Sequence, residues 1–181
     1  MGQVKEHPPV KFFAGITYNP DFKGLQDILN LLEETFSMIE IKSEPYEFSD
    51  FTPYYESEMG TSLKKFFVVF NDLQPPESLP DFKIKSNQIE SKFILENKRQ
   101  INIDPGYVSE AKVVLATTKN YDHRLYLGQG IFGDLHLKFT NKEFHSQPWT
   151  YPDYKQEQVI QFFMDLRQTY FKQLGEKYSN F

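Results

Sequence analysis

Apolar runs and helical stripes alternate along the first part of the chain. The run at 10–18 (VKFFAGITY) is rich in β-branched and aromatic residues, which is typical of a strand buried on both faces. Asn19 and Pro20 then supply a helix cap and a proline in the first turn. One apolar stripe at helical spacing predicts the helix itself, and it consists of Phe22, Leu25, Ile28, Leu29, Leu32 and Phe36.

Three further strands and a second helix are predicted next. Alternation over 39–48 predicts a strand, which Pro45 places at an edge or a bulge. The apolar run 63–70 predicts a third strand, and 100–103 predicts a short fourth one. A second helical stripe lies between them, made of Leu79, Phe82, Ser86, Ile89 and Phe93. The order β-α-β-β-α-β is that of the ferredoxin-like fold, in which two helices cover one face of an antiparallel sheet.

The last third of the chain adds elements to this core. The stretch 109–118 could be a short helix or a buried strand, because its periodicity fits both. The segments 124–127 and 131–139 flank Gly128-Gln129-Gly130 and predict a β-hairpin. A final helix is predicted over 153–174, with Asp153 and Gln156 at capping-box spacing.

The register of the hairpin decides which side chains share a face. If Leu127 pairs with Ile131, Arg124 lies opposite Asp134. One face would then carry Arg124, Tyr126, Phe132, Asp134 and His136, and the other would carry Leu125, Leu127, Leu135 and Leu137. The whole pattern predicts one α+β domain over residues 1–181, with 1–8 as a loose N-terminal tail. We expect a ferredoxin-like β-α-β-β-α-β core with an added C-terminal β-hairpin and helix, a mixed sheet, and helices chiefly on one face.

Composition narrows the class of protein. The chain has 0 cysteines, which excludes a disulfide framework, thiolate metal sites and cysteine nucleophiles, and favours a reducing compartment. Its net charge of -5 argues against nucleic acid as a partner, since phosphate neutralisation needs a basic surplus. No apolar run reaches the roughly 18 residues that a membrane-spanning helix needs. We therefore expect a cytoplasmic protein with neither a nucleic-acid nor a membrane partner.

Reactive side chains and tight-turn residues crowd together between residues 102 and 154. Asp104-Pro105-Gly106-Tyr107 follows a predicted strand and predicts a type II turn. The Asp104 carboxylate could bind a metal such as Mg²⁺, act as a base, or accept N–H bonds from its own turn. Thr117-Thr118-Lys119 offers hydroxyls and an ammonium for an anion, although no phosphate-loop motif is present.

His123 and Arg124 form the next candidate pair. A histidine transfers protons near neutral pH, and an arginine clamps an anion through two hydrogen bonds. Alternatively, His123 is a structural histidine and Arg124 forms a surface ion pair with Asp134. His136 and Asp134 could also reach a metal from one strand face.

The segment Trp149-Thr150-Tyr151-Pro152-Asp153-Tyr154 carries the 1 tryptophan of the chain. Its rings could stack on a base or sugar of a ligand, or they could fasten the last helix to the sheet. There is no Gly-x-Ser-x-Gly or His-Glu-x-x-His motif, so covalent catalysis and a zinc-protease site have no support.

Several of these strings together resemble a known family. They are Phe13-Ala14-Gly15, the 51–60 loop with Tyr54-Tyr55 and Glu58-Met59-Gly60, 102–107, 115–127 and 149–154. The chain resembles a bacterial family known only as a domain of unknown function, whose members sometimes carry the label "GTP-binding protein". The resemblance covers about 10–174 and implies that the strings belong to one unit. It brings no mechanism, and the sequence has neither a phosphate loop nor an Asn-Lys-x-Asp string for guanine.

These observations favour a protein that binds a small anionic molecule, with nucleotides as one class. Lys119 and Arg124 would hold the anion, Thr118 and His123 would line the pocket, and Asp104 would bind Mg²⁺ or a hydroxyl. Stacking would come from Tyr107, or from Trp149 and Tyr151. One alternative is a hydrolase or lyase with His123 as general base and Asp104 as its orienting residue or metal ligand. The other is a scaffold or interaction protein without a ligand.

Overall fold

The computed structural model describes the backbone of residues 2–178 and the side chains of residues 2–175, and it is built on a 9-stranded sheet. The strands lie in the order β11-β10-β8-β7-β1-β4-β2, with β3 also on β4 and β9 also on β10. Their bounds are β1 (Val10–Tyr18), β2 (Ile39–Lys42), β3 (Tyr46–Glu47), β4 (Lys64–Gln74), β7 (Ile101–Val108), β8 (Lys112–Thr117), β9 (Leu125–Gly128), β10 (Ile131–Thr140) and β11 (Glu143–Ser146). All strand pairings among the described residues are antiparallel, so the mixed sheet expected from the sequence is wrong. A separate hairpin joins β5 (Ile94–Leu95) to β6 (Lys98–Arg99).

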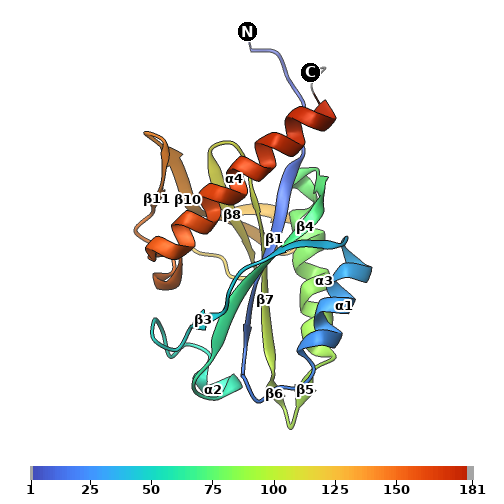
Figure 1. Ribbon diagram of the computed structural model, residues 1–181, viewed down its shortest axis with the longest axis vertical. Coiled ribbons are helices and arrows are strands. Elements are labelled where there is room, and N and C mark those ends of the chain that lie inside the picture. The colour runs from blue at the N-terminus through green and yellow to red at the C-terminus, as the bar shows by residue number, and fades with distance from the viewer. Residues whose placement is uncertain (1, 179–181) are drawn as a thin grey trace.

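Helices cover both faces of this sheet (Figure 1). They are α1 (Leu25–Thr35), α2 (Glu56–Met59), α3 (Leu79–Ser91) and α4 (Glu157–Tyr178), with 3₁₀ turns η1 (Pro76–Ser78) and η2 (Pro152–Lys155). Helices α1 and α3 lie side by side on one face, whereas α4 runs diagonally across the other (Figure 1). The expectation that helices lie chiefly on one face is therefore wrong. The molecule has three layers, with the sheet in the middle.

Two hydrophobic cores follow from the alternation of side chains along the central strand β1. Phe12, Ala14 and Ile16 point to the α1 and α3 side, and Phe12 stacks on Phe82 of α3 at 4.0 Å between ring centroids. Phe13 points the other way and meets Phe163 of α4 edge to face at 4.9 Å. The strand is thus apolar on both faces, as the run at 10–18 predicts.

The starts of two helices differ from the sequence prediction. Helix α1 begins at Leu25, because Asn19 closes a local turn by accepting the backbone N–H of Asp21 at 2.9 Å. The last helix begins at Glu157 rather than at residue 153. Asp153 lies in η2 and caps no helix through its side chain, because its carboxylate is buried against the sheet.

Two segments with ambiguous or turn-like sequences are strands. The stretch 109–118 contains β8, which pairs with β7 on one side and β10 on the other. Asp104-Pro105-Gly106-Tyr107 does not form the predicted turn; it lies inside β7, where Asp104 pairs with Gly15 of β1. The predicted fourth strand is therefore longer than expected.

The predicted hairpin forms with a shifted register. Gly128 rather than Leu127 pairs with Ile131, and a bulge follows, so Arg124 still reaches Asp134. A second irregularity lies between Leu135 and Leu137 in the pairing of β10 with β8. It places these two leucines on opposite faces, since Leu135 packs against the α1 and α3 core and Leu137 belongs to the α4 core. The prediction that they share one face is wrong.

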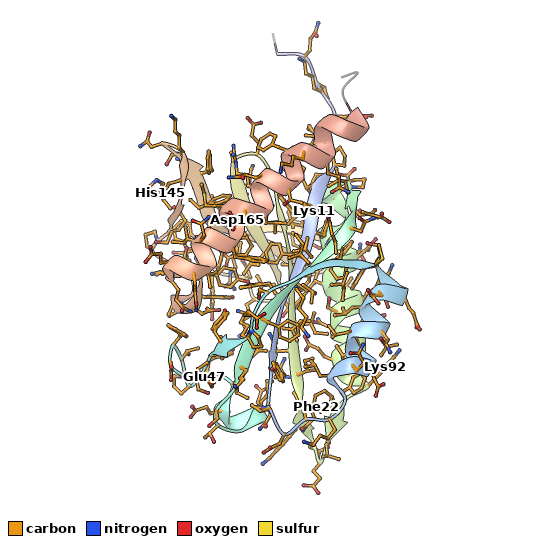
Figure 2. All side chains as sticks on the ribbon, in the orientation of Figure 1. Lys11, Phe22, Glu47, Lys92, His145 and Asp165 are labelled. Carbon is orange, nitrogen blue, oxygen red and sulfur yellow. The ribbon has the colours of Figure 1, made fainter. Side chains whose placement is uncertain are left out.

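Helix α4 leaves part of its face of the sheet uncovered. In Figure 2, Lys11 and Asp165 mark the region where α4 crosses, and Glu47 of β3 lies beyond the end of that helix. The uncovered region lies near β3 and α2 (Figure 1). Residues 2–9 form neither helix nor strand, and Met1 and 179–181 of the predicted single domain lie outside the described residues. Within the described part of the chain, no helix is both long and apolar enough to cross a membrane.

Candidate functional site

Two adjoining cavities lie where β7 and β8 diverge. β8 pairs with β7 only at Gly106–Val108, but its pairing with β10 continues to Thr117. The cavities have volumes of about 190 and 230 Å³ and share part of their walls. The shared lining residues are Tyr54, Tyr55, Asp104, Lys119 and Tyr151.

Pro105 and Gly106 explain where the two strands part. The backbone N–H and C=O of Ile103 face the edge of β7 that points to β8, but they bond to side chains of α3. Backbone directions alternate along a strand, so the nitrogen of Pro105, two residues on, faces the same edge. Proline has no N–H and cannot extend the ladder there. At Gly106 the two strands lie close together. Only glycine fits there, because a Cβ atom would lie 2.5 Å from the carbonyl oxygen of Val114. β7 is therefore unpaired with β8 before Gly106 and paired with β8 from Gly106 onwards.

Helix α3 reaches into this opening with two charged side chains. Glu90 accepts the backbone N–H of Ile103 at 2.7 Å, and Lys83 donates to the Ile103 carbonyl at 3.0 Å. The ammonium of Lys83 also lies 3.2 Å from the carboxylate of Asp104. Arg99 adds a second cation, 3.2 Å from Glu90 and 2.7 Å from Glu58. The backbone N–H and C=O of Ile103 at the open edge of β7 are thus hydrogen-bonded without a neighbouring strand.

Burial and charge act in opposite directions on these carboxyl groups. Burial alone raises the pKa of Asp104, but the ammonium groups of Lys83 and Lys65 and two hydrogen bonds outweigh it, so the pKa lies below its usual value. For Glu90 burial prevails over the nearby cations, and its pKa is raised. Asp104 is therefore the more firmly ionised of the two.

The mouth of the first cavity is formed by the loop after β8. The ammonium of Lys119 contacts the hydroxyl of Tyr54 and lies 4.4 Å from the centroid of its ring. Arg124 holds this loop in place through three donors. Its Nε donates to Asp134 at 2.8 Å, one terminal nitrogen to the Lys119 carbonyl at 3.0 Å, and the other to the Tyr151 hydroxyl at 3.3 Å.

A buried ion pair closes the inner end of the same cavity. The Nζ atom of Lys65 lies 2.6 Å from Oδ2 of Asp153, and the side chains are 2% and 1% exposed. The hydroxyl of Tyr46 donates to the same carboxylate oxygen at 2.9 Å. Gly15 leaves room for the lysine, since a Cβ atom there would lie 3.0 Å from its Cε. The Lys65 ammonium also lies 4.6 Å from the ring centroid of Tyr154.

Asp134 and His136 connect this region to the segment before α4. His136 Nδ1 lies 3.2 Å from Asp134, and its Nε2 accepts the backbone N–H of Tyr151 at 3.2 Å. The second bond requires an unprotonated Nε2, so the neutral ring carries its proton on Nδ1. Burial lowers the pKa of His136 more than the Asp134 carboxylate raises it. Both residues are fully engaged with the protein.

The structure brings together five of the eight residues that the sequence singled out. Asp104, Lys119, Arg124 and Tyr151 line the first cavity, and Thr118 lines the second. Tyr107, His123 and Trp149 line neither cavity.

The three remaining residues have structural surroundings. Tyr107 packs against the ring of Phe12 on the other side of the sheet, 5.9 Å away. His123 stacks on Trp149 at 4.7 Å and 17°, and Trp149 donates its indole N–H to the backbone of β10. The carboxylates beside His123 are Asp122, at 3.1 Å, and Asp134, at 3.5 Å. A pair of His123 as base and Asp104 as its orienting residue has no support in this geometry.

Several residues that line the cavities were not predicted from the sequence. Lys65 and Asp153 form the inner wall, and Lys83, Glu90 and Arg99 line the second cavity. Lys65 follows Lys64 at the start of β4, just before an apolar run, and only the structure shows which of the two lysines is buried with a partner. Nothing in the sequence marks Lys83 or Glu90, since both lie on a helix among other polar residues.

A metal site is not evident among the described residues. No group of three or more histidine, aspartate or glutamate side chains stands together there in a way that could hold a metal ion. The carboxylate of Asp104 instead receives Lys83 and the side-chain amide of Asn102, at 3.2 and 2.7 Å.

Comparison with known proteins gives one match. No curated protein and no solved structure matches the chain. A family model described as "Domain of unknown function (DUF4416)" matches residues 8–170, which includes every element that forms the two cavities. The chain therefore belongs to this uncharacterised family.

Proposed function

We propose that this protein is a cytoplasmic binding protein for a small anionic molecule, which occupies the cavities between β7 and β8. The observation that carries the proposal is a concentration of cations in a chain of net charge -5. The cationic side chains that line the two cavities are Lys65, Lys83, Arg99, Lys119 and Arg124. The carboxylates of Glu90, Asp104 and Asp153 line the same cavities, so five cations against three anions leave a positive balance that favours an anionic ligand. The cysteine-free composition supports the cytoplasmic part of the proposal.

Lys119 is the cation best placed to receive the anionic group. Lys65, Lys83, Arg99 and Arg124 each have a carboxylate within salt-bridge distance. Among the described residues Lys119 has none, and it is exposed at the mouth. Its charge is therefore not neutralised by the protein. The bond from Arg124 to its carbonyl keeps it beside the cavity.

The walls of the first cavity suit a ligand that also has a ring. Tyr54, Tyr121 and Tyr151 line this cavity and offer ring faces as well as hydroxyl groups. Nucleotides and phosphosugars combine an anion with a flat or compact ring, so they are the first classes to screen.

A thermal-shift screen with Lys119→Ala tests the proposal. We expect a nucleotide, phosphosugar or carboxylate to raise the melting temperature, since a ligand at about 100 times its Kd adds roughly 2.7 kcal/mol. Lys119→Ala should raise the dissociation constant of that ligand by about tenfold, because a charge-assisted bond is lost. Lys142→Ala is the matched control, as Lys142 is an exposed lysine that lines neither cavity. If no anion stabilises the wild-type protein, the proposal is wrong.

We also propose that the central part of the fold is a ferredoxin-like unit of β1, α1, β2, β4, α3 and β7. The strand order β7-β1-β4-β2 and the position of α1 and α3 on one face support it. β8 to β11 and α4 would be additions to this unit. Superposition of an experimental structure on ferredoxin-like domains tests the assignment, and a different strand order would contradict it.

A further inference from the structure

Asp153 keeps an unused hydrogen-bond acceptor at the inner end of the first cavity. Its Oδ2 receives both Lys65, at 2.6 Å, and Tyr46, at 2.9 Å. Its Oδ1 has no hydrogen-bond partner among the described residues, although the side chain is only 1% exposed and lines the cavity. A buried acceptor left without a partner costs about 1–3 kcal/mol, more when it is charged, so such atoms are rare in folded proteins.

The surrounding residues do not supply the missing donor. Lys65 and Tyr46 are both directed to Oδ2, and the 3₁₀ turn that contains Asp153 has no cap bond from a side chain. The hydroxyl of Tyr154 is also buried without a partner. No hydrogen bond between described residues reaches Oδ1, so a molecule in the cavity that Asp153 lines can supply this donor.

The two ends of the cavity favour different ligand groups. Lys119 at the exposed mouth favours a negatively charged group, and Asp153 at the buried end favours a neutral hydrogen-bond donor. A bare inorganic anion suits only the mouth, and the Asp153 carboxylate would repel it if it entered further. An organic anion with a hydroxyl group remote from its charge suits both ends.

We infer that the ligand is a hydroxylated organic phosphate of the sugar-phosphate class, with its phosphate at Lys119 and a hydroxyl that donates to Oδ1 of Asp153. This inference rests on the proposed function and adds the chemical class of the ligand. Tyr54 and Tyr151, which line the same cavity, would flank the sugar ring.

Two ligands of equal charge and similar shape test the inference. Titration calorimetry on the wild-type protein would compare ribose 5-phosphate with cyclopentylmethyl phosphate, which has a five-membered ring but no hydroxyl. We expect ribose 5-phosphate to bind about tenfold more tightly or better, as a hydrogen bond to a charged acceptor provides. Equal affinities would mean that water serves Oδ1, which overturns the inference and leaves the proposed function standing. Binding of inorganic phosphate without binding of ribose 5-phosphate also overturns the inference and leaves the proposed function standing. If none of the three ligands binds, the inference is wrong, and the thermal-shift screen with the other anions decides the proposed function.

Variants of the inner wall locate the source of the preference. In Asp153→Asn the amide oxygen is expected to face Lys65 and Tyr46, which turns the amide N–H donors towards the ligand hydroxyl. The bond that the hydroxyl donates to a charged acceptor is then replaced by a weaker neutral bond that the hydroxyl accepts, so the ratio of the two dissociation constants should fall below its wild-type value. Should this variant fail to fold, the double variant Lys65→Met with Asp153→Leu replaces the ion pair by apolar groups, a change that is often tolerated. Its ratio should fall in the same way.

Two controls keep the outcome specific. Tyr46→Phe removes the bond to Oδ2 and leaves Oδ1 in place, so the ratio should persist. Lys119→Ala should raise the dissociation constants of both phosphate ligands by the same factor, so the ratio of the two constants should stay near its wild-type value. A ratio that keeps its wild-type value in the double variant Lys65→Met with Asp153→Leu would overturn the inference.

Discussion

The Nζ atom of Lys65 lies 2.6 Å from Oδ2 of Asp153, and the two residues are 88 positions apart in the chain. The pair joins a central strand of the sheet to the turn before α4, and both side chains are almost fully buried. Taking two charges out of water costs several kcal/mol for each ion, and their attraction repays this only when both are present. Together with the bonds of Tyr46 to Asp153 and of His136 to Tyr151, the pair fixes the segment before α4 on the sheet.

Removal of one partner of this pair should strongly destabilise the fold. Asp153→Ala leaves the Lys65 ammonium buried without its carboxylate, and we expect a loss of about 3–5 kcal/mol in the free energy of unfolding. Urea denaturation measures it. Lys64→Met is the control, because Lys64 pairs with Glu47 at the surface, at 3.1 Å, and should cost less than about 1 kcal/mol. Similar losses in the two variants would contradict the role of the buried pair.

The open edge of β7 should depend on Glu90. Glu90→Ala removes the acceptor of the Ile103 N–H, and we expect a loss of about 1–3 kcal/mol in stability. The Ile103 amide should also exchange with solvent faster, which hydrogen exchange followed by NMR measures. Glu90→Gln retains an acceptor and should preserve most of the protection. Unchanged exchange at Ile103 in Glu90→Ala would show that another group serves this N–H.

Stability should fall in mildly acidic solution because of His136. Its pKa in the folded protein is lowered, chiefly by burial, so the unfolded chain binds the extra proton first. The contribution is complete above the ordinary histidine pKa of about 6.5 and is lost as the pH falls towards the folded value. In that window the free energy of unfolding should drop by up to about 1.4 kcal/mol per pH unit.

A series of urea titrations at different pH values checks this slope. His136→Gln should flatten it, whereas His145→Gln should not, since His145 is exposed and bonds only to a backbone carbonyl. The Asp134 carboxylate beside His136 has a lowered pKa, set by its bonds to His136 and Arg124 against the opposing effect of burial, so its own contribution is lost only at lower pH. A slope unchanged in His136→Gln would refute the assignment.

Gly106 should tolerate no side chain. In Gly106→Ala the new Cβ would lie 2.5 Å from the Val114 carbonyl oxygen and 2.8 Å from both Leu115 and Phe13, so the strands must separate. We expect a loss of about 1–3 kcal/mol, as for overpacked cores, measured as a lower midpoint of urea unfolding. Gly175→Ala is the counterpart in α4, where nothing lies within 4 Å, and it should stabilise the protein by about 0.5–1 kcal/mol. A neutral Gly106→Ala would contradict the close approach.

The sequence by itself determined the parts that depend on local periodicity. The strand at Val10–Tyr18, the stripes of α1 and α3, and the hairpin around Gly128-Gln129-Gly130 all follow from spacing within one segment. The contact of Arg124 with Asp134 also followed, because a hairpin brings together residues only ten positions apart, but the predicted surface ion pair is buried, with side chains 3% and 1% exposed. The boundaries were less certain: Asp153 has the spacing of a helix cap, yet its carboxylate faces Lys65.

Only the tertiary structure decided how the candidate site is assembled. Its walls come from β4, β7, β8, α3 and the segments around Tyr54 and Tyr151, and no local pattern encodes which of these segments meet. The Pro105-Gly106 pair predicts a turn in isolation, but pairing with β1 keeps it extended and makes it the point where β7 and β8 part. His123 and Trp149 stack on each other outside the cavities, which no local pattern encodes either. Side-chain convergence depends on contacts between distant segments, whereas the polarity and spacing of each segment are properties of the chain alone.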